Sequence, residues 1–277
     1  MLKKLFIVII LVIVGWTGFY FIVPNVSRLK KEAPRKTSFM EFRESEWQRE
    51  GKKRRISQIW VPLTRISPYL IKAVIIAEDD KFWQHEGFDL EAIQKAMEKD
   101  LRAGKFKAGG STISQQLAKN LYLTPAKNPI RKIKEAIITW RIERTLPKKR
   151  IIELYLNVVE WGEGIFGIEA ASRYYFGKNA ASLTPEEAAR LAVVLPNPRK
   201  MNPAGSSPYV AKRAEFIKNI MIKRGIVIPD YEEVMTPEAG TEQGPGLEYK
   251  ADQALPSPIF GPSKVPGGEE KTVTEER

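Results

Sequence analysis

The sequence predicts an all-α body that follows one apolar segment. Apolar residues recur at intervals of three and four over most of residues 67–224, whereas the alternation typical of strands is almost absent. Apolar residues make up 43% of the 277 residues, enough for a substantial core. A chain of this length has room for one large domain or two small ones.

The first element is an uncharged run from Leu5 to Val23. As a helix it would be roughly 29 Å long, about the thickness of the hydrocarbon core of a bilayer. Four aromatic residues lie between positions 16 and 21, as expected near a membrane interface. A cleaved signal peptide is the alternative, but Pro24 follows directly and no A-x-A-like site is present. Residues 1–24 are therefore predicted as an uncleaved transmembrane anchor.

The next segment, residues 25–54, is polar and is predicted as a stalk or linker. Lys3 and Lys4 precede the apolar run, and five Lys or Arg residues follow it between positions 28 and 36. The positive-inside rule alone therefore does not place the body outside the cytoplasm.

The folded body is predicted over residues 55–227. Ser67 can cap its first helix, and Pro68 suits the first helical position. Further helical patterns lie at Glu91–Arg102, Thr112–Leu121, Ile130–Leu146, Lys149–Asn157, Ile168–Phe176, Pro185–Leu195 and Tyr209–Arg224. From residue 228 onward Pro, Gly and Glu dominate without periodicity, so residues 228–277 are predicted as a disordered acidic tail.

The charge of the chain is unevenly distributed. The net charge is +12, but the segment from Pro229 to Arg277 holds 11 acidic and 4 basic residues, which leaves +19 for the rest. Such a basic body favours an anionic partner: nucleic acid, anionic lipid or a phosphorylated substrate. The chain has no cysteine and one histidine, His85, which excludes disulfides, thiolate chemistry and histidine-rich metal sites.

Glu78 is the first candidate for chemistry. On the helix that begins near Ser67, Ile71, Val74 and Ile75 form an apolar stripe that Glu78 continues. A carboxylate on such a stripe loses hydration, which raises its pKa and suits proton abstraction near neutral pH. The structural alternative is an exposed acid at a helix end or one paired with Lys81. If the helix persists, Phe82 and His85 extend the stripe, and His85 alone is more typical of a hydrogen-bonded structural residue.

The second candidate is the stretch KAGGSTISQQLAKNLYL, residues 107–123. Its two glycines permit a tight turn, and Thr112 with Gln115 fits a capping box. The apolar face is Ile113, Leu117 and Leu121, and the polar face is Thr112, Gln116, Lys119 and Asn120. A glycine-rich turn that opens a helix can bind an anion, although a capped amphipathic helix needs no function.

The third candidate is the stretch from residue 128 to 157. Its buried side is predicted to be Ile133, Ala136, Ile137 and Trp140. Glu135 lies four residues after Arg131 and three after Lys132, so the three can meet. Surface ion pairs of this kind are common and contribute only about 0.3–0.5 kcal/mol. The functional interpretation is that one acid acts as a base while the cations hold a phosphorylated group.

In order along the chain, these stretches resemble the five motifs of the family-51 glycosyltransferases, the peptidoglycan glycosyltransferases. EDDKFWQHEGFD resembles the first motif, GGSTISQQLAKN the second and RKIKE the third. ELYLN through FGIEAASRYYFGK resembles the fourth, and LTPEEAARLAVVLPNPRKMNP the fifth. The resemblance covers about residues 55–225. Because no transpeptidase domain is expected in the remaining residues, the monofunctional biosynthetic subgroup is the expected one.

The resemblance implies a lysozyme-like helical fold with a larger lobe and a smaller, membrane-facing lobe. It implies that the enzyme polymerises lipid II into linear glycan strands, releasing undecaprenyl diphosphate with inversion. It also implies a single-pass protein of the cytoplasmic (inner) membrane whose catalytic domain faces the periplasm. The expected partners are lipid II, the growing glycan strand, membrane lipid and other cell-wall synthesis or division proteins, and no nucleic acid.

The resemblance also implies roles for individual residues. Glu78 matches the general base that deprotonates the acceptor 4-hydroxyl, and Glu135 the second essential glutamate, near the diphosphate of the donor. The substrate-binding positions fall in three groups: the cations Lys119, Arg131 and Lys132; the polar residues Ser111, Thr112, Gln116 and Asn120; and the first-motif residues Asp79, Phe82 and His85, whose roles are partly structural.

The resemblance makes no cofactor certain. A divalent cation, Mg²⁺ or Mn²⁺, assists some members of the family, and no ligand for one is assigned here. Two other functions stay open from the residues alone: a glycan-cleaving, muramidase-like enzyme that uses two carboxylates, and a non-catalytic, membrane-tethered binder of an anionic polymer.

Overall fold

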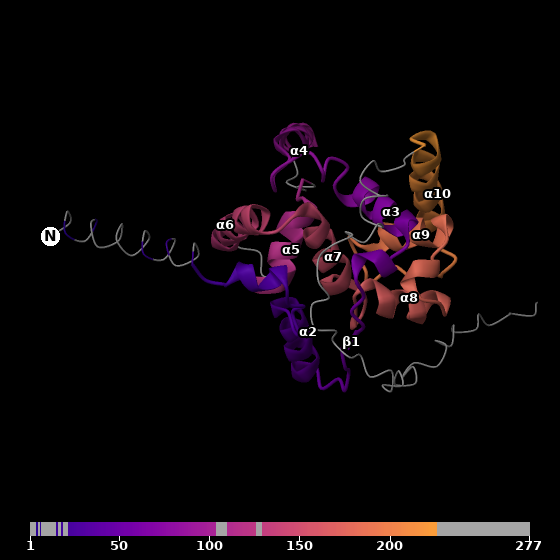
Figure 1. Cartoon of the computed structure of the whole chain (residues 1–277), viewed down its shortest axis with the longest axis horizontal. Coiled ribbons are helices and arrows are strands. Elements are labelled where there is room, and N and C mark those ends of the chain that lie inside the picture. Colours follow the sequence, from indigo (N-terminus) through magenta and orange to yellow (C-terminus); the bar gives the residue numbers. More distant parts are fainter. Residues whose placement is uncertain are drawn as a thin grey trace, which may run out of the picture. The chain divides into compact units, whose positions relative to one another are not determined.

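The computed structural model describes residues 22–103, 110–125 and 129–225, together with Lys4, Phe6, Gly15 and Gly18. Helices dominate this part of the chain (Figure 1). The 3₁₀ helices are η1 (Val26–Lys30), η2 (Leu63–Arg65) and η3 (Ala180–Ser182). The α-helices are α2 (Ser38–Arg49), α3 (Pro68–Glu78), α4 (Leu90–Ala103), α5 (Ile113–Tyr122), α6 (Pro129–Thr145), α7 (Lys148–Val158), α8 (Ile168–Phe176), α9 (Pro185–Val194) and α10 (Pro208–Lys223).

The helices of the predicted body are confirmed, each within two residues of its predicted ends. Pro68 opens α3 as expected, but Ser67 does not cap it, because its hydroxyl donates to the Leu183 carbonyl at 2.9 Å. A small sheet was not predicted: β1 (Ser57–Gln58), β2 (Glu160–Gly162) and β3 (Ile165–Phe166), in the order β1-β3-β2. Strands of two or three residues are too short to show an alternating pattern.

The register of the sheet joins distant parts of the chain. β1 pairs in parallel with β3, Ser57 opposite Ile165, and β2 pairs antiparallel with β3, Glu160 opposite Phe166. The sheet therefore fixes the chain that leads into α3 against the chain that leads into α8.

The core forms where α3 packs on α9 and α10, and where α5 packs on α6 and α7 (Figure 1). Leu70 and Val74 of α3 and Leu117 of α5 are fully buried and belong to one contiguous apolar cluster. The helix that ends at Glu78 is therefore held on the body by its own apolar side chains.

Residues 25–54, predicted as a stalk or linker, instead contain η1 and α2, which pack against the folded body. Met40 and Trp47 of α2 are buried, and the Arg43 guanidinium donates to the buried Glu160 carboxylate, with Nε and Nη2 both 2.9 Å from Oε2. The prediction was wrong because only Met40 and Trp47 of α2 are buried apolar residues, and the charged Arg43 completes the attachment. The composition of residues 25–54 is therefore as polar as that of a linker, although the segment is folded.

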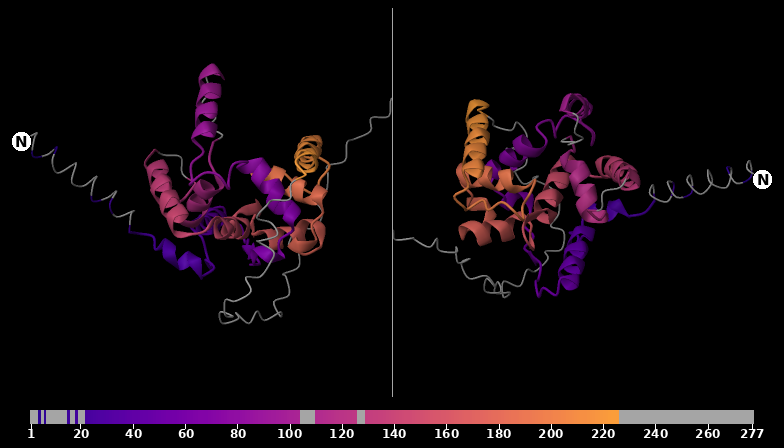
Figure 2. Two further views of the ribbon diagram at one scale, coloured as in Figure 1. Left: turned by 45° about the horizontal axis from the view of Figure 1, so that its top comes forward. Right: turned by 180° about the vertical axis from the view of Figure 1, so that it is seen from behind.

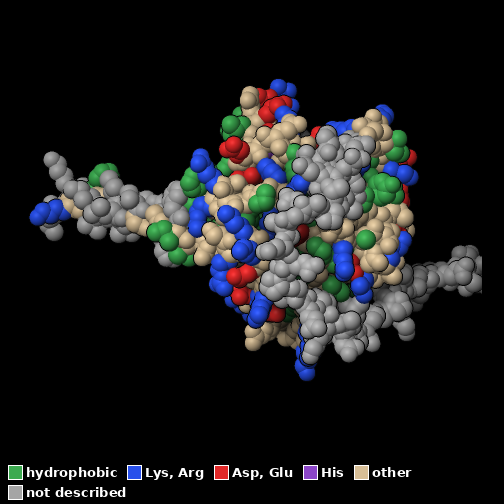
Figure 3. Space-filling view, in the orientation of Figure 1, with side chains coloured by type: hydrophobic (Ala, Val, Ile, Leu, Met, Phe, Trp, Pro, Cys, Tyr) green, Lys and Arg blue, Asp and Glu red, His purple; other side chains and the backbone are tan. Residues whose placement is uncertain are grey.

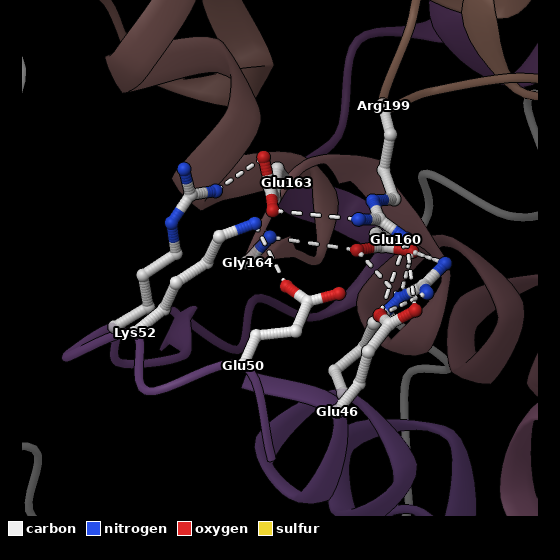
Figure 4. A network of polar contacts seen from close by, with 9 residues as sticks. Glu46, Glu50, Lys52, Glu160, Glu163, Gly164 and Arg199 are labelled. Atoms are coloured by element: carbon white, nitrogen blue, oxygen red, sulfur yellow. Dashed lines mark hydrogen bonds and ion pairs between the residues drawn. The ribbon is translucent and has the colours of Figure 1, made fainter. Parts of the chain in front are cut away.

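Ion pairs extend this attachment (Figure 4). Arg199 lies 3.1 Å from Glu46 of α2 and 3.5 Å from Glu163, which follows β2. Arg43 also donates to Glu46 at 2.8 Å. The network connects α2, the sheet and the segment after α9.

The structure corrects the predicted orientation of α6. Ile133 and Trp140, predicted as buried, are 50% and 42% exposed. The buried side is instead Glu135, Ile138, Thr139 and Ile142. Apolar residues lie around much of this helix, so their spacing did not decide which face packs. In the space-filling view, Lys and Arg side chains lie beside apolar ones over α6 (Figure 3).

The helix α4 stands apart from the other helices (Figure 2). Leu90, Met97 and Leu101 on it are exposed. The basic Lys95 pairs with Glu91 of the same helix at 2.5 Å.

Two predicted segments lie outside the described residues: most of the run from Leu5 to Val23, and all of residues 228–277. Across the described ranges, no helix combines the length and the apolar character that a membrane crossing requires. The boundaries at residues 1–24, 55–227 and 228–277 therefore stay predictions.

Candidate active site

The loop that follows α3 is tied to the N-terminus of α5 by Asp79. The Asp79 carboxylate accepts the backbone N–H of Ile113 at 2.9 Å and faces Nε2 of His85 at 2.9 Å. The Gly87 N–H donates to Nδ1 of His85 at 3.0 Å, so the ring proton lies on Nε2 and is donated to Asp79. The helix therefore ends at Glu78, so the apolar stripe does not continue along it to Phe82 and His85.

The N-terminus of α5 has the predicted capping box. The Thr112 side chain accepts the Gln115 N–H at 3.2 Å, and the Gln115 side chain accepts the Thr112 N–H at 3.0 Å. The Thr112 hydroxyl also donates to the Gly87 carbonyl at 2.7 Å. Gly87 has φ 94°, and a Cβ there would lie 2.9 Å from Cγ of Glu143. Only glycine fits this close approach between the loop and α6.

Glu78 accepts a hydrogen bond from α5. Its Oε2 lies 2.7 Å from Nε2 of Gln116, whose Oε1 accepts the Tyr155 hydroxyl at 3.0 Å. The alternative pairing with Lys81 does not occur, because Lys81 pairs with Glu91. Among the described residues, Oε1 of Glu78 accepts no hydrogen bond, so one carboxylate oxygen is left for a substrate.

Burial is the main influence on the pKa of Glu78, and it raises that pKa. The Gln116 hydrogen bond and the charge of Lys119 lower it in part, and the charge of Asp79 raises it further. A carboxylate with this balance is a stronger base than an ordinary surface glutamate.

Glu135 is buried on α6 but is paired with two cations. Its Oε2 accepts Nη1 of Arg131 at 2.8 Å, and its Oε1 accepts the Lys132 ammonium. Lys132 also lies 3.3 Å from the hydroxyl of the exposed Ser111. The predicted meeting of Glu135 with both cations is confirmed.

Lys119 connects the two acids. Burial lowers its pKa, the charges of Glu135 and Glu78 raise it, and those of Arg131 and Lys132 lower it. Both carboxylates and both cations therefore lie within electrostatic range of one lysine. Residues from the end of α3, from α5 and from α6 are brought into one neighbourhood.

The remaining predicted site residues contact protein groups. Phe82 is buried, with its ring centroid 4.6 Å from Nζ of Lys148, and it supports the loop with Asp79 and His85. Asn120 donates to the Gln116 carbonyl at 2.9 Å. A direct contact of these residues with a substrate stays a prediction.

Sequence reasoning missed two residues beside this cluster. Tyr155 lies within the apolar pattern of α7, where nothing distinguishes it from a core side chain. Glu143 is half-buried, and its carboxylate accepts hydrogen bonds from the Ser114 hydroxyl and from Nζ of Lys148, the latter at 2.8 Å. The spacing between Glu143 and Lys148 matches neither of the usual helical pairs, so a search for i,i+3 and i,i+4 pairs does not find it.

The described residues contain no group of three or more His, Asp or Glu that could hold a metal ion. These side chains therefore offer no ready donor set for a divalent cation, and whether one assists stays a prediction.

The arrangement defines a class of protein. A poorly hydrated carboxylate lies within electrostatic range of Lys119, and so does a second carboxylate that pairs with Arg131 and Lys132, on a helical body. An enzyme of this class takes a proton from a hydroxyl while the cations bind an anionic group close by.

Comparison with known proteins then identifies the family. A family model described as Transglycosylase matches residues 45–222. The biosynthetic peptidoglycan transglycosylase of Dechloromonas aromatica is 53% identical over 184 residues, which cover 66% of this chain and 80% of that protein. The protein of the same name from Aromatoleum aromaticum is 54% identical over 189 residues, which cover 68% of this chain and 82% of that protein. The one from Methylobacillus flagellatus is 44% identical over 221 residues, which cover 79% of this chain and 96% of that protein. The chain belongs to the transglycosylase family.

Proposed function

We propose that this protein is a peptidoglycan glycosyltransferase that polymerises lipid II into linear glycan strands. Glu78 is the general base, and Lys119, Arg131 and Lys132, oriented by Glu135, bind the diphosphate of the donor. Family membership and the names of the relatives support the reaction, and the geometry around Lys119 supports the roles.

In the proposed reaction, Glu78 takes the proton from the 4-hydroxyl of the acceptor sugar. The oxygen forms a bond to the anomeric carbon of the donor sugar from the face opposite the diphosphate. The bond between that carbon and the diphosphate oxygen breaks, and undecaprenyl diphosphate leaves with the electron pair. Three cations can neutralise the charge that develops on the leaving group, so no general acid is needed.

One observation carries this proposal: the charges of Glu78 and of Glu135 both raise the pKa of Lys119, so both carboxylates lie within electrostatic range of that lysine. A base remote from the cations could not act on a hydroxyl beside a cation-bound diphosphate. The shared electrostatic range of Lys119 supports a single site in which the base and the cations act on one pair of substrates.

The test is a polymerisation assay with purified full-length protein and lipid II. We expect the wild type to form polymer and Glu78→Gln to lose about 10²–10⁴-fold in rate while its circular dichroism is unchanged. Glu215→Gln, an exposed carboxylate on α10, is the control and should keep full activity. Retained turnover in Glu78→Gln would remove the base assignment.

The same assay separates the alternative functions. Fragments released from finished peptidoglycan without polymer growth would indicate a muramidase-like enzyme. No reaction with either substrate, together with salt-sensitive binding of an anionic polymer, would indicate a non-catalytic binder.

The proposal includes a membrane location, with the body on the periplasmic side, where lipid II is polymerised. The exposed Ile133 and Trp140 give α6 an apolar outer face. The next residue, Arg141, donates to the carbonyl of Ile22 at 3.0 Å. The predicted span from Leu5 to Val23 therefore ends beside this face, which supports contact between α6 and the bilayer surface.

A single fluorescent label tests the membrane contact, because the chain has no cysteine. Ile133→Cys carries an environment-sensitive label in full-length protein reconstituted into vesicles. Phe216→Cys on α10 is the matched control, since Phe216 is 51% exposed. We expect a lipid-borne quencher to reduce the emission at position 133 but not at 216. Equal, weak quenching at both positions would exclude the contact.

A further inference from the structure

Tyr155 lies at the start of a chain of hydrogen bonds that ends at Glu78. Its hydroxyl donates to Oε1 of Gln116 at 3.0 Å, and Nε2 of the same amide donates to Oε2 of Glu78 at 2.7 Å. The three residues come from α7, α5 and the end of α3. Tyr155 is fully buried, and it is not among the residues assigned to the reaction above.

The hydroxyl of Tyr155 is a permanent donor at neutral pH. Burial raises its pKa well above the ordinary value, and the charges of Glu78 and Asp79 raise it further. A phenol that keeps its proton can bond the oxygen of the Gln116 amide by donation, whereas it could bond the NH₂ group only by acceptance.

The orientation of the Gln116 amide decides the environment of Glu78. As observed, the NH₂ group faces the carboxylate and donates to it. If the amide were reversed, its oxygen would face a carboxylate oxygen at hydrogen-bonding distance, and both atoms are acceptors only. The charges of Lys119 and Asp79 act on Glu78, but neither side chain is hydrogen-bonded to the Gln116 amide among the described residues.

We propose that Tyr155 is a positioning residue that fixes the Gln116 amide so that it donates to Glu78. This inference rests on the proposed role of Glu78 as the base. The hydrogen bond from Gln116 stabilises the carboxylate form, so Tyr155 keeps the base ionised at lower pH.

The sign of the expected pH effect follows directly. Turnover requires ionised Glu78, so the rate of polymerisation rises with pH through the pKa of that carboxyl group. Loss of the Gln116 bond raises this pKa, because the bond lowers it. The acid side of the pH profile should therefore move to higher pH.

The first test is Tyr155→Phe in the full-length chain, with polymerisation of lipid II measured against pH. We expect the acid limb to move up by about half to one pH unit, the amount that corresponds to one net hydrogen bond. Tyr175→Phe is the matched control, because the half-buried Tyr175 donates to the Trp161 carbonyl at 3.3 Å, outside this chain of bonds. Its acid limb should stay where it is in the wild type.

A double variant shows whether Tyr155 acts through the amide. Gln116→Met alone should move the acid limb as Tyr155→Phe does, and the combination should move it no further. If Tyr155→Phe alone does not fold, Gln116→Met and the double variant can still be compared, because the double variant leaves no unpaired amide oxygen. A further shift in the double variant would overturn the inference.

The outcomes separate this inference from the proposed function. An active Tyr155→Phe enzyme with reduced rate and an unmoved acid limb would show a merely structural tyrosine and leave Glu78 as the base. Polymerisation that survives in Glu78→Gln would instead remove the function on which the inference rests.

Discussion

At the scale of single residues, Glu78 and Glu135 are two carboxylates in opposite environments. Glu78 has one amide donor and loses hydration, whereas Glu135 has two cations bound to its two oxygens. The charged form of Glu78 therefore lowers the stability of the fold, whereas the charged form of Glu135 is stabilised by its two cations. Replacing each by glutamine should therefore change the stability of the protein in opposite directions.

Glu78→Gln should raise the stability at neutral pH. The pKa of Glu78 is raised in the folded state, so folding is most favoured below the unfolded pKa of about 4.5 and loses this contribution as pH rises through the folded pKa. Thermal melting at pH 7 should show a higher Tm for the variant, by about 2–4 °C for each kcal/mol. The two melting curves should converge below about pH 4. A lower Tm at pH 7 would contradict the raised pKa.

Glu135→Gln should lower the stability. It leaves Arg131 and Lys132 without their carboxylate, but the Lys132 side chain is half-exposed, so water replaces part of the interaction. We expect a loss of about 1–3 kcal/mol in the free energy of unfolding, measured by urea denaturation. Glu215→Gln is again the control. An unchanged or raised midpoint would indicate that the two ion pairs add nothing in the folded state.

At the scale of elements, α5 is the point where the site is assembled. Its first N–H groups bind Asp79 and Thr112, and its next turns carry Gln116 and Lys119. Periodicity predicted this helix and its capping box, because both depend on residues close in sequence. The link to Tyr155 could not be predicted, because it joins residues 39 positions apart.

The attachment of α2 shows the same limit. Helical periodicity identifies helices by their apolar stripes, and the apolar stripe of α2 is too short for this helix to be recognised. Its contact depends on Arg43 and Glu160, which are 117 positions apart. The buried face of α6 was also predicted wrongly. Apolar side chains are expected to be buried and charged ones exposed, but on α6 the apolar Ile133 and Trp140 are exposed and the charged Glu135 is buried.

The α2 attachment gives a prediction at this scale. Arg43→Met should lower the free energy of unfolding by about 3–5 kcal/mol, because Glu160 would stay buried without a cationic partner. The double variant with Glu160→Gln should recover part of this loss. Arg199→Met is the control, since Arg199 is more exposed and its change should cost less than about 1 kcal/mol. Urea midpoints of the four proteins would measure this, and an Arg43→Met loss no larger than the control would contradict it.

At the scale of the whole molecule, the proposed membrane location predicts separable contributions of charge and of apolar surface to membrane association. The chain carries 45 Lys and Arg against 33 Asp and Glu. Each cation near an anionic surface contributes about 1 kcal/mol, and salt screens that attraction over the Debye length.

Association with anionic vesicles should therefore weaken as salt rises from about 0.1 M to about 1 M. Association with neutral vesicles should change much less, because the apolar contribution of α6 and of the predicted anchor does not depend on screening. Vesicle flotation at the two salt concentrations would measure both. Equal salt dependence for the two lipids would show that charge does not contribute.

The last described helix ends beside the loop that follows α3. Arg224, just after α10, donates to Asp80 at 2.8 Å, and α10 and α9 both pack on α3. Asp80 lies two residues after Glu78, the proposed base, so this half-exposed ion pair joins the loop after α3 to chain made more than 140 positions later. During synthesis, a nascent chain that has not yet reached Arg224 has no complete support for its base. Newly made enzyme should thus stay inert until nearly all of the body has emerged from the ribosome.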